Sequence, residues 1–250
     1  MEKYSLIWWV ILTVYVLVTT HLSSLSVSLY LHREYTHNAI ALHPVVRSFF
    51  KFIIWFQTGM VPAEWVVVHK EHHQAPADGP NDPHSPRNEG KWRIVLFGVL
   101  YYTRAARKLR PQIQAELSAR PDITSKRVIK HLGVFLNLLL NIFLFGSVGV
   151  FVWLIQSVWI PFWAAGIING LGHSAHVAHA HTRDYSRNIL DNGPSWVRVV
   201  LSIITAGESN HHNHHCKPSS PNFAFREENE FDWGYTVVRF LKRFGFASIR

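Results

Sequence analysis

Apolar positions gather in two long runs that contain no charged side chain. The first run covers residues 6–31, and the second covers residues 132–172. An α-helix rises about 1.5 Å per residue and crosses a bilayer in about 20 residues, so the first run suffices for one span and the second for two. A Gly-Ser-Val-Gly stretch at 146–149 interrupts the second run and predicts a tight turn. We therefore expect three membrane helices, over about 6–31, 132–148 and 150–171, because backbone groups in lipid must be satisfied within a helix.

A third apolar stretch, from 45 to 68, differs because polar residues interrupt it. Arg47, Lys51, Pro62 and Glu64 all lie within it. This pattern favours a helix that lies along the membrane interface. A fourth span is the alternative.

The amount of charge supports a membrane protein. Only 16% of the residues are charged, against about 25% in typical soluble domains. Helices buried in a water-soluble protein are the alternative, but the Trp residues near the ends of the apolar runs suit interfacial belts.

The positions of the basic residues predict the orientation. The chain has 25 Lys and Arg against 16 Asp and Glu, and ten of the basic residues lie between 91 and 130. The turn at 146–149 has none, so the positive-inside rule assigns the basic region to the cytoplasm. The predicted fold is all-α: one multi-pass integral membrane domain over 1–250, with a cytosolic helical cap formed by 69–131 and 173–250.

Histidine is the residue type in excess, with 17 histidines and a single cysteine. Cys216 alone forms neither an internal disulfide nor a thiolate metal site. Spacings of three and four place imidazoles on one helix face, and one such pattern occurs twice in the chain. The predicted topology puts all the clusters just outside the same membrane face. They are His32 and His37; His69, His72 and His73; Asn169 and His173; and His211, His212, His214 and His215.

This repetition predicts a metal centre. Imidazole binds iron, zinc, copper and nickel alike, so the residue type does not choose the metal. Nine of these histidines, all except His212, are candidate ligands. This number exceeds the three or four ligands of one zinc ion and predicts two neighbouring metal ions. Each histidine taken singly has helix capping or hydrogen bonding as the alternative. A metal transporter would place its ligands near the bilayer midplane, where His21 alone lies in the predicted topology.

The ordered motifs of the chain resemble those of the membrane fatty-acyl desaturases, in particular the stearoyl-type Δ9 acyl desaturases and their bacterial relatives. The similarity covers most of the chain. The motifs are His32-Arg33-Glu34-Tyr35-Thr36-His37; Glu64-Trp65 ahead of His69-Lys70-Glu71-His72-His73; Asp82-Pro83-His84-Ser85-Pro86; Asn169-Gly170-Leu171-Gly172-His173; Gly207-Glu208 ahead of His211 to His215; and Phe231-Asp232-Trp233-Gly234.

The resemblance implies an activity and its cofactors. It implies a helical membrane domain whose cytosolic cap holds a histidine-rich di-iron site. The expected enzyme is an O2-dependent oxidoreductase of fatty acid biosynthesis that inserts a cis double bond, Δ9 by family, into a saturated acyl chain. The acyl chain would be linked to CoA, to a carrier protein or to a lipid.

The resemblance also implies roles for individual residues. Asn169 corresponds to a residue that approaches one iron through a water. Carboxylates usually bind the outer nitrogen of a metal-bound histidine, and Glu34, Glu71, Asp82 and Glu208 are expected in that role, with solvated salt links as the alternative. The iron ligands would be His32, His37, His69, His72, His73, His173, His211, His214 and His215.

Some positions depart from the family pattern. His176, His179 and His181 replace an aromatic stretch, His212 replaces an Asn, and one span rather than two precedes the first motif. We expect these histidines in hydrogen bonding or on the surface, and a changed substrate or added metal affinity is the alternative. His84 is expected in a hydrogen bond behind the metal ligands or simply as part of a loop. His21 is expected in a hydrogen bond with Thr20 or a neighbouring helix.

A membrane di-iron hydroxylase is the nearest alternative function. Hydroxylases usually have three residues between the first two histidines, whereas four separate His32 from His37. This spacing favours desaturation.

The partners follow from what the chain contains and lacks. It has no Gly-x-Gly-x-x-Gly fingerprint, so electrons must come from a separate ferredoxin-, rubredoxin- or cytochrome-type donor. The basic stretch 91–130 is expected to meet CoA phosphates, an acidic carrier protein or anionic headgroups, or only to set the topology. No motif indicates nucleic acid. The acyl chain is expected between the apolar helices, with Trp55, Trp65 or Trp163 at its bend.

Overall fold

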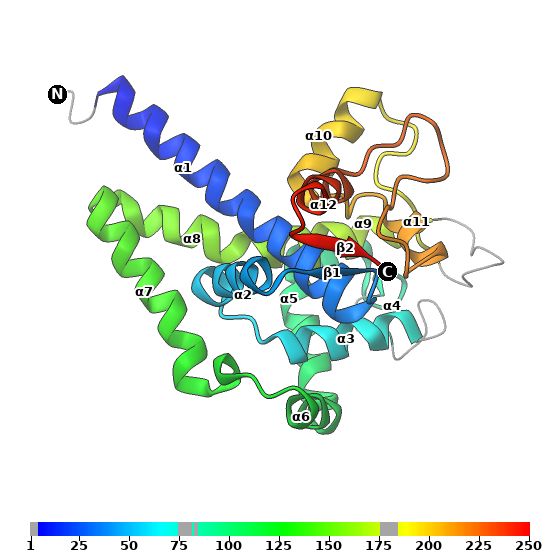
Figure 1. The fold of residues 1–250 in the computed structure, drawn as a ribbon, viewed down its shortest axis with the longest axis horizontal. Coiled ribbons are helices and arrows are strands. Elements are labelled where there is room, and N and C mark those ends of the chain that lie inside the picture. Colours follow the sequence, from blue (N-terminus) through cyan, green and yellow to red (C-terminus); the bar gives the residue numbers. More distant parts are fainter. Residues whose placement is uncertain (1–4, 75–81, 83–84, 176–184) are drawn as a thin grey trace.

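The computed structural model describes residues 5–74, 82, 85–175 and 185–250. Its regular elements in this part of the chain are helices and two short strands, which confirms the all-α prediction (Figure 1). The expectations for His84, His176, His179 and His181 concern residues outside the described part of the chain.

Three helices in the described ranges are long and apolar enough to cross a membrane, in agreement with the prediction. They run from Leu6 to Thr36, from Val128 to Phe145 and from Val148 to Gly172. The first therefore extends to Thr36 rather than to residue 31. The elements that form these three candidate spans, called the first, second and third span below, are α1 (Leu6–Leu25) with the π-helical η1 (Ser26–Thr36); α7 (Arg127–Phe145); and α8 (Val148–Ile160) with the π-helical η3 (Pro161–Ile168) and α9 (Asn169–Gly172).

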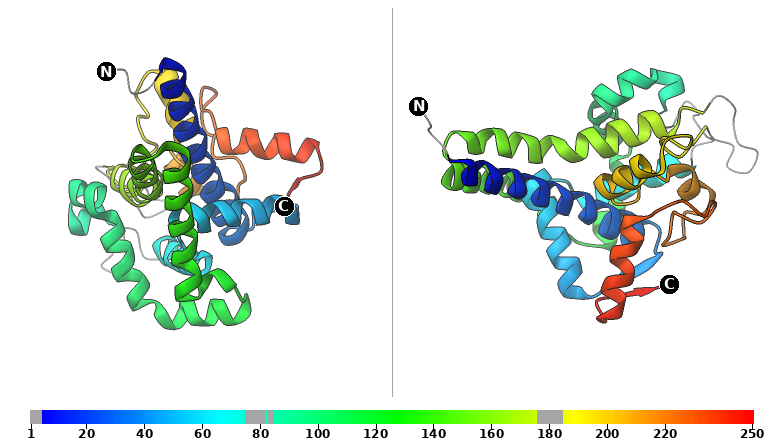
Figure 2. Two further views of the ribbon diagram at one scale, coloured as in Figure 1. Left: turned by 90° about the vertical axis from the view of Figure 1, so that its left-hand side faces the viewer. Right: turned by 90° about the horizontal axis from the view of Figure 1, so that it is seen from above.

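A cluster of buried amides joins the three spans. The third span packs against both others, and it runs alongside the first in the right-hand view of Figure 2. The side-chain amides of Asn137 and Asn141 donate hydrogen bonds to Gln156 Oε1, at 2.9 and 3.0 Å, and Gln156 Nε2 donates to Thr19 Oγ1 at 2.9 Å. Lipid offers these groups no water, so hydrogen bonds between helices satisfy them and fix the hairpin against the first span.

The predicted interfacial helix over 45–68 is two helices. α2 (Pro44–Thr58) ends at Gly59, whose φ of 61° places it in the left-handed region, and α3 (Pro62–Gln74) begins at a proline. Glycine at this C-cap and proline at the next helix start are typical chain breaks. The break turns the chain, so that α3 carries its histidines away from α2.

Part of the segment 69–131, which the sequence assigned to the cytosolic cap, packs against the third span. The helix α5 (Lys91–Lys108) packs against η3 and α9 of the third span. A side chain at Gly98 would collide with the carbonyl of Ala165, since a Cβ there lies 2.1 Å from its oxygen. Glycine at this position therefore lets α5 approach the third span at the backbone.

The remaining elements enclose the end of the first span. The strand β1 (Ile40–Leu42) pairs antiparallel with β2 (Ala247–Ile249) near the C-terminus. The main buried core surrounds η1 and includes Leu29, Leu31 and Val238. The other elements are α4 (Pro86–Glu89), α6 (Arg110–Ala119), η2 (Ile123–Ser125), α10 (Ser195–Thr205), α11 (His211–Cys216) and α12 (Trp233–Arg243).

Candidate metal centre

The nine histidines singled out in the sequence lie together in two neighbouring groups. Within each group, one nitrogen of every ring lies within 4.8 Å of one nitrogen of every other ring. The first group is His32, His37, His69, His73 and His214, and the second is His72, His173, His211 and His215.

The π-helical end of the first span explains how His32 and His37 reach the same group. Residues five apart lie on different faces of an α-helix, but they lie one above the other where hydrogen bonds run from residue i to i+5. The backbone N–H of His37 donates such a bond to the carbonyl of His32, at 3.1 Å.

The helices α3 and α11 contribute to both groups because of their repeated spacing. His69 and His73, four residues apart, face the first group, while His72 between them faces the second. On α11 the pair that is four apart, His211 and His215, faces the second group, and His214 faces the first. The two helices therefore run between the groups.

The donor atoms of the first group fit a cation better than a set of hydrogen bonds. Four contacts of 2.9–3.1 Å connect the Nε2 atoms of its five rings in a chain. Each Nε2 carries at most one hydrogen or one lone pair, so linear hydrogen bonds cannot satisfy all four contacts at once. Lone pairs that converge in this way are the arrangement that a bound metal ion requires.

Burial keeps these imidazoles neutral. Together with the neighbouring rings, it lowers the pKa of His69, His73, His214 and His215 well below the ordinary value. Burial is also the main reason why the pKa of His37 falls to about 2. The neutral ring is the form that binds metal.

Two of the four predicted carboxylates hold a histidine ring. Glu208 Oε2 lies 2.7 Å from His32 Nδ1, and Asp82 Oδ1 lies 2.9 Å from His72 Nδ1. Such contacts fix the ring orientation and leave Nε2 directed at the metal position.

The other two carboxylates do not bind a histidine in the described structure. Glu34 accepts hydrogen bonds from the backbone N–H of Leu42 and from the guanidinium of Arg47, at 2.7–3.1 Å. Glu71 has no histidine partner among the described residues. The expected role is therefore wrong for Glu34, whose carboxylate neutralises Arg47 instead.

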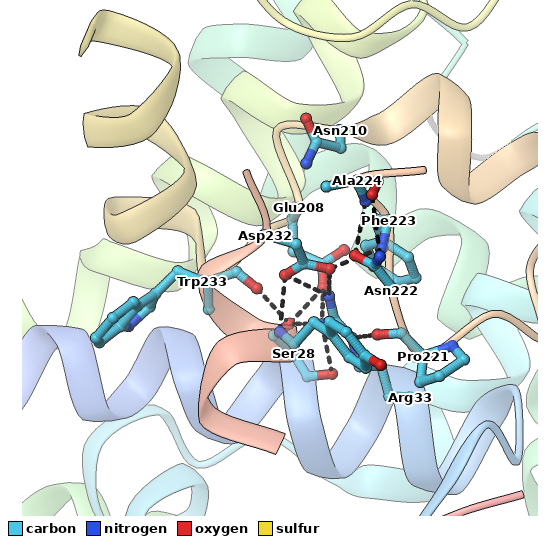
Figure 3. Close-up of polar contacts among 12 residues, drawn as sticks. Ser28, Arg33, Glu208, Asn210, Pro221, Asn222, Phe223, Ala224, Asp232 and Trp233 are labelled. Atoms are coloured by element: carbon cyan, nitrogen blue, oxygen red, sulfur yellow. Dashed lines mark hydrogen bonds and ion pairs between the residues drawn. The ribbon is translucent and has the colours of Figure 1, made fainter. Parts of the chain in front are cut away.

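A fully buried arginine, Arg33, contacts Glu208 on the side away from His32 (Figure 3). Arg33 has 0% exposure, and its guanidinium lies 3.8 Å above the ring of Phe223. Its Nη2 donates to both oxygens of Asp232, at 2.9 and 3.1 Å, and its Nη1 contacts Glu208 Oε1 at 3.2 Å. An unbroken chain of contacts thus runs from Asp232 through Arg33 and Glu208 to His32.

This chain also sets the charge of Glu208. Burial alone would raise the pKa of this carboxyl group, but His32, Arg33 and the hydroxyl of Ser28 stabilise the charged form and lower the pKa to about 2. Arg33 and Asp232 belong to the ordered motifs of the sequence, which predicted no role for either residue. The available signal was an arginine at the end of a membrane span, where a buried cation needs an anionic partner.

An apolar cavity of about 120 Å³ adjoins the histidines. His32, His69 and His211 line it together with Glu208 and Asn169, and its other walls are apolar side chains from the spans, α3 and α5. Of the three tryptophans expected at the acyl chain, only Trp65 lines this cavity, where it stacks on His69. The indole of Trp55 instead donates to the carbonyl of Ile129.

Two of the histidines that were expected in hydrogen bonds, His212 and His21, lie in the described part of the chain and outside both groups. The ring of His212 is buried and bonds to Ser186 Oγ at 2.7 Å, as expected for a hydrogen-bonding histidine. His21 in the first span accepts a hydrogen bond from the indole of Trp233 on α12, at 2.8 Å, whereas the hydroxyl of Thr20 bonds to Val16.

These features define a helical membrane protein with a histidine-rich centre suited to metal, next to an apolar cavity. The fatty acid desaturase family model matches residues 7–230. The chain belongs to this family and is an oxidoreductase that acts on fatty acids.

Curated relatives agree with this assignment. The chain is 29% identical over 244 residues to Delta-9 acyl-lipid desaturase 1 of Arabidopsis thaliana, covering 96% of this chain and 75% of that protein. It is 27% identical over 231 residues to Delta-9 acyl-lipid desaturase 2 of the same plant, covering 91% and 70%. An acyl-CoA 5-desaturase of Anemone leveillei is 26% identical over 245 residues, covering 96% and 70%.

Proposed function

We propose that this fatty-acyl desaturase inserts a cis double bond at the Δ9 position of a saturated acyl chain, at a centre that holds two iron ions. The observation that carries the proposal is the division of nine imidazoles into a group of five and a group of four beside one apolar cavity. Relatives named for Δ9 desaturation support the position of the bond.

The residues fit a pair of iron ions. The first group would hold one ion and the second group the other, and Asn169, one turn before His173, would approach an ion through a water molecule. Bound iron would supply the oxidation of an unactivated C–H bond by O2, which acidic and basic side chains cannot achieve.

The side chains of this protein would position the reactants. Glu208 and Asp82 orient His32 and His72 through their Nδ1 atoms. Trp65 and the small side chains of Ala164 and Ala165 would hold the acyl chain along the cavity and exclude water from the reacting carbons.

The remaining assignments complete the proposal. The chain forms one domain with three spans, and the histidine centre faces the cytoplasm, since the basic residues 91–130 flank it. A separate ferredoxin-, rubredoxin- or cytochrome-type protein supplies two electrons. The acyl group arrives on CoA, on a carrier protein or in a lipid, and the basic residues meet its phosphate or acidic groups.

The test is double-bond mapping by mass spectrometry on the acyl chains of cells that express the protein. His214→Ala removes a member of the first group, and His212→Asn is the matched control on the same helix, outside both groups. We expect a Δ9 monoenoic chain with the wild type and with His212→Asn, and none with His214→Ala. Hydroxylated chains, or a bond at another position, would contradict the proposal.

A further inference from the structure

The helix α12 near the C-terminus has an exposed apolar face that the histidine centre does not use. Trp233, Val237, Phe240 and Phe244 follow at spacings that place them on one side of the helix. Trp233 and Val237 pack partly against the core around η1, so the exposed part of this face is formed by Phe240 and Phe244. Phe240 is 62% exposed and Phe244 is 59% exposed. Two large aromatic side chains on one helix face are a costly exposure to water, which indicates a covering partner.

The start of this face touches a membrane span. The indole Nε1 of Trp233 donates to His21 Nε2 at 2.8 Å. His21 lies in the span that begins at Leu6, about 22 Å along the helix axis from that residue. A hydrocarbon core about 30 Å thick that begins near Leu6 extends about 8 Å beyond His21, so the aromatic face of α12 begins within the hydrocarbon region, near its boundary.

Exposed basic residues accompany the apolar face. Arg239, Lys242 and Arg243 are exposed, and none of them forms an ion pair with a residue that the structure describes. No acidic residue follows Asp232 to the end of the chain. Basic and apolar residues on separate sides are typical of helices that lie in a bilayer interface.

Neighbouring helices continue the apolar surface around the first span. The helices α2 and α10 both pack against α1, and α10 also packs against α12 (Figure 1). Trp196 on α10 is 68% exposed, and Phe52 on α2 is 48% exposed. The carbonyl of Phe246, just after α12, accepts the backbone N–H of His43 at the start of α2, at 2.8 Å. The three helices are therefore neighbours beside the first span, with α2 and α10 against α1 and α12 against η1.

We propose that α12 lies in the lipid interface on the side of the histidine centre, with Phe240 and Phe244 among the acyl chains and Arg239, Lys242 and Arg243 on anionic phospholipid headgroups. The partner is the bilayer and not another protein, because the aromatic face is continuous with a membrane span at Trp233. This inference moves α12 out of the water-exposed cap that the sequence predicted.

The depth of α12 can be measured with an environment-sensitive fluorophore on a single cysteine. Cys216→Ser removes the native cysteine, and Phe244→Cys introduces the labelling site in the otherwise full-length protein, labelled and then reconstituted into nanodiscs. Glu228→Cys, on an exposed loop, is the control for water. Phe143→Cys, 85% exposed on the second span, is the control for lipid.

The proposal predicts a blue-shifted emission from the label at residue 244. Phosphatidylcholine that carries a nitroxide near its headgroup should quench this emission more strongly than phosphatidylcholine that carries the nitroxide near the end of its acyl chain. Emission like that of the label at residue 228, without quenching by either lipid, would overturn it.

A second experiment tests the contact between the basic residues of α12 and anionic headgroups. Hydrogen exchange of residues 236–246 is compared in nanodiscs of phosphatidylcholine alone and with added phosphatidylglycerol. Each basic residue near an anionic surface contributes about 1 kcal/mol, or roughly fivefold. We expect phosphatidylglycerol to slow exchange in the wild type and not in Lys242→Glu/Arg243→Glu. Equal exchange of the wild type in both lipids would overturn the charge contact.

Discussion

At the scale of the residue, the described structure links a metal-site histidine to a buried ion pair. His32 contacts Glu208, and Glu208 contacts Arg33. The guanidinium of Arg33 in turn binds both carboxylate oxygens of Asp232. Asp232 also caps α12 by accepting the N–H of Tyr235. The same carboxylate therefore fixes a helix near the C-terminus and, through Arg33, a ring at the end of the first span.

Arg33→Gln should unfold the protein at a lower temperature and reduce its metal content. Without the guanidinium, Asp232 and Glu208 are buried as uncompensated charges, and breaking a buried pair costs about 3–5 kcal/mol. Thermal unfolding and metal analysis of the purified protein measure both effects. Arg47→Lys, at an ion pair with an exposed cation, should change neither by much. Normal metal content and stability in Arg33→Gln would contradict the role of this chain of contacts.

The two carboxylates that hold histidine rings should differ from Glu34 in their effect on metal affinity. Removing such an outer partner typically weakens metal binding about 10–100-fold. Glu208→Gln and Asp82→Asn should therefore weaken binding in a competition titration with a chelator. Glu34→Gln, which faces Arg47 instead, should bind metal as the wild type does. Equal losses in all three variants would show that the contacts to the rings are unimportant.

At the scale of the element, the sequence predicted the spans and missed how they end. Long uncharged runs are sufficient to predict membrane helices, because their length matches the bilayer. The π-helical turn that brings His32 and His37 together leaves no signature in hydrophobic spacing, since it arises from a local change of hydrogen-bond register. The break at Gly59 was readable from Gly59 and Pro62, but the apolar residues on both sides of it favoured a single interfacial helix.

The amide cluster between the spans should contribute measurably to stability. Interhelical hydrogen bonds in membranes average about 0.6 kcal/mol each. Gln156 takes part in three of them, with Asn137, Asn141 and Thr19. Gln156→Ala should therefore destabilise the protein by roughly 2 kcal/mol in a detergent-unfolding titration. Phe143→Ala, on the lipid-exposed side of α7, is the matched control, and an equal effect of both would exclude a special contribution of the cluster.

At the scale of the whole molecule, the histidine centre and the apolar cavity share residues from distant parts of the chain. His32 comes from the first span, His69 from α3 and His211 from α11, and all three line the cavity. The sequence predicted these histidines because their spacing is regular. It could not predict the cavity, since its walls depend on how α3 packs against the end of the first span and how α5 packs against the third span.

Filling the cavity should abolish turnover without removing metal. Ala164 lines the cavity on η3, and Ala164→Phe would occupy space needed by the acyl chain. We expect normal metal content with loss of activity on long chains, measured on the same preparation. Ala119→Phe, at an exposed position on α6, should leave both unchanged. Full activity of Ala164→Phe on long chains would mean that the substrate lies elsewhere.

The most direct test of the central claim is the iron stoichiometry of the purified protein and of one variant in each histidine group. We expect one iron ion for each group in the wild type, measured by elemental analysis, with Mössbauer spectroscopy to identify the sites. His214→Ala should lose the iron of the first group, and His215→Ala should lose the iron of the second. A single metal ion in the wild type, or zinc in place of iron with activity retained, would contradict a two-iron centre.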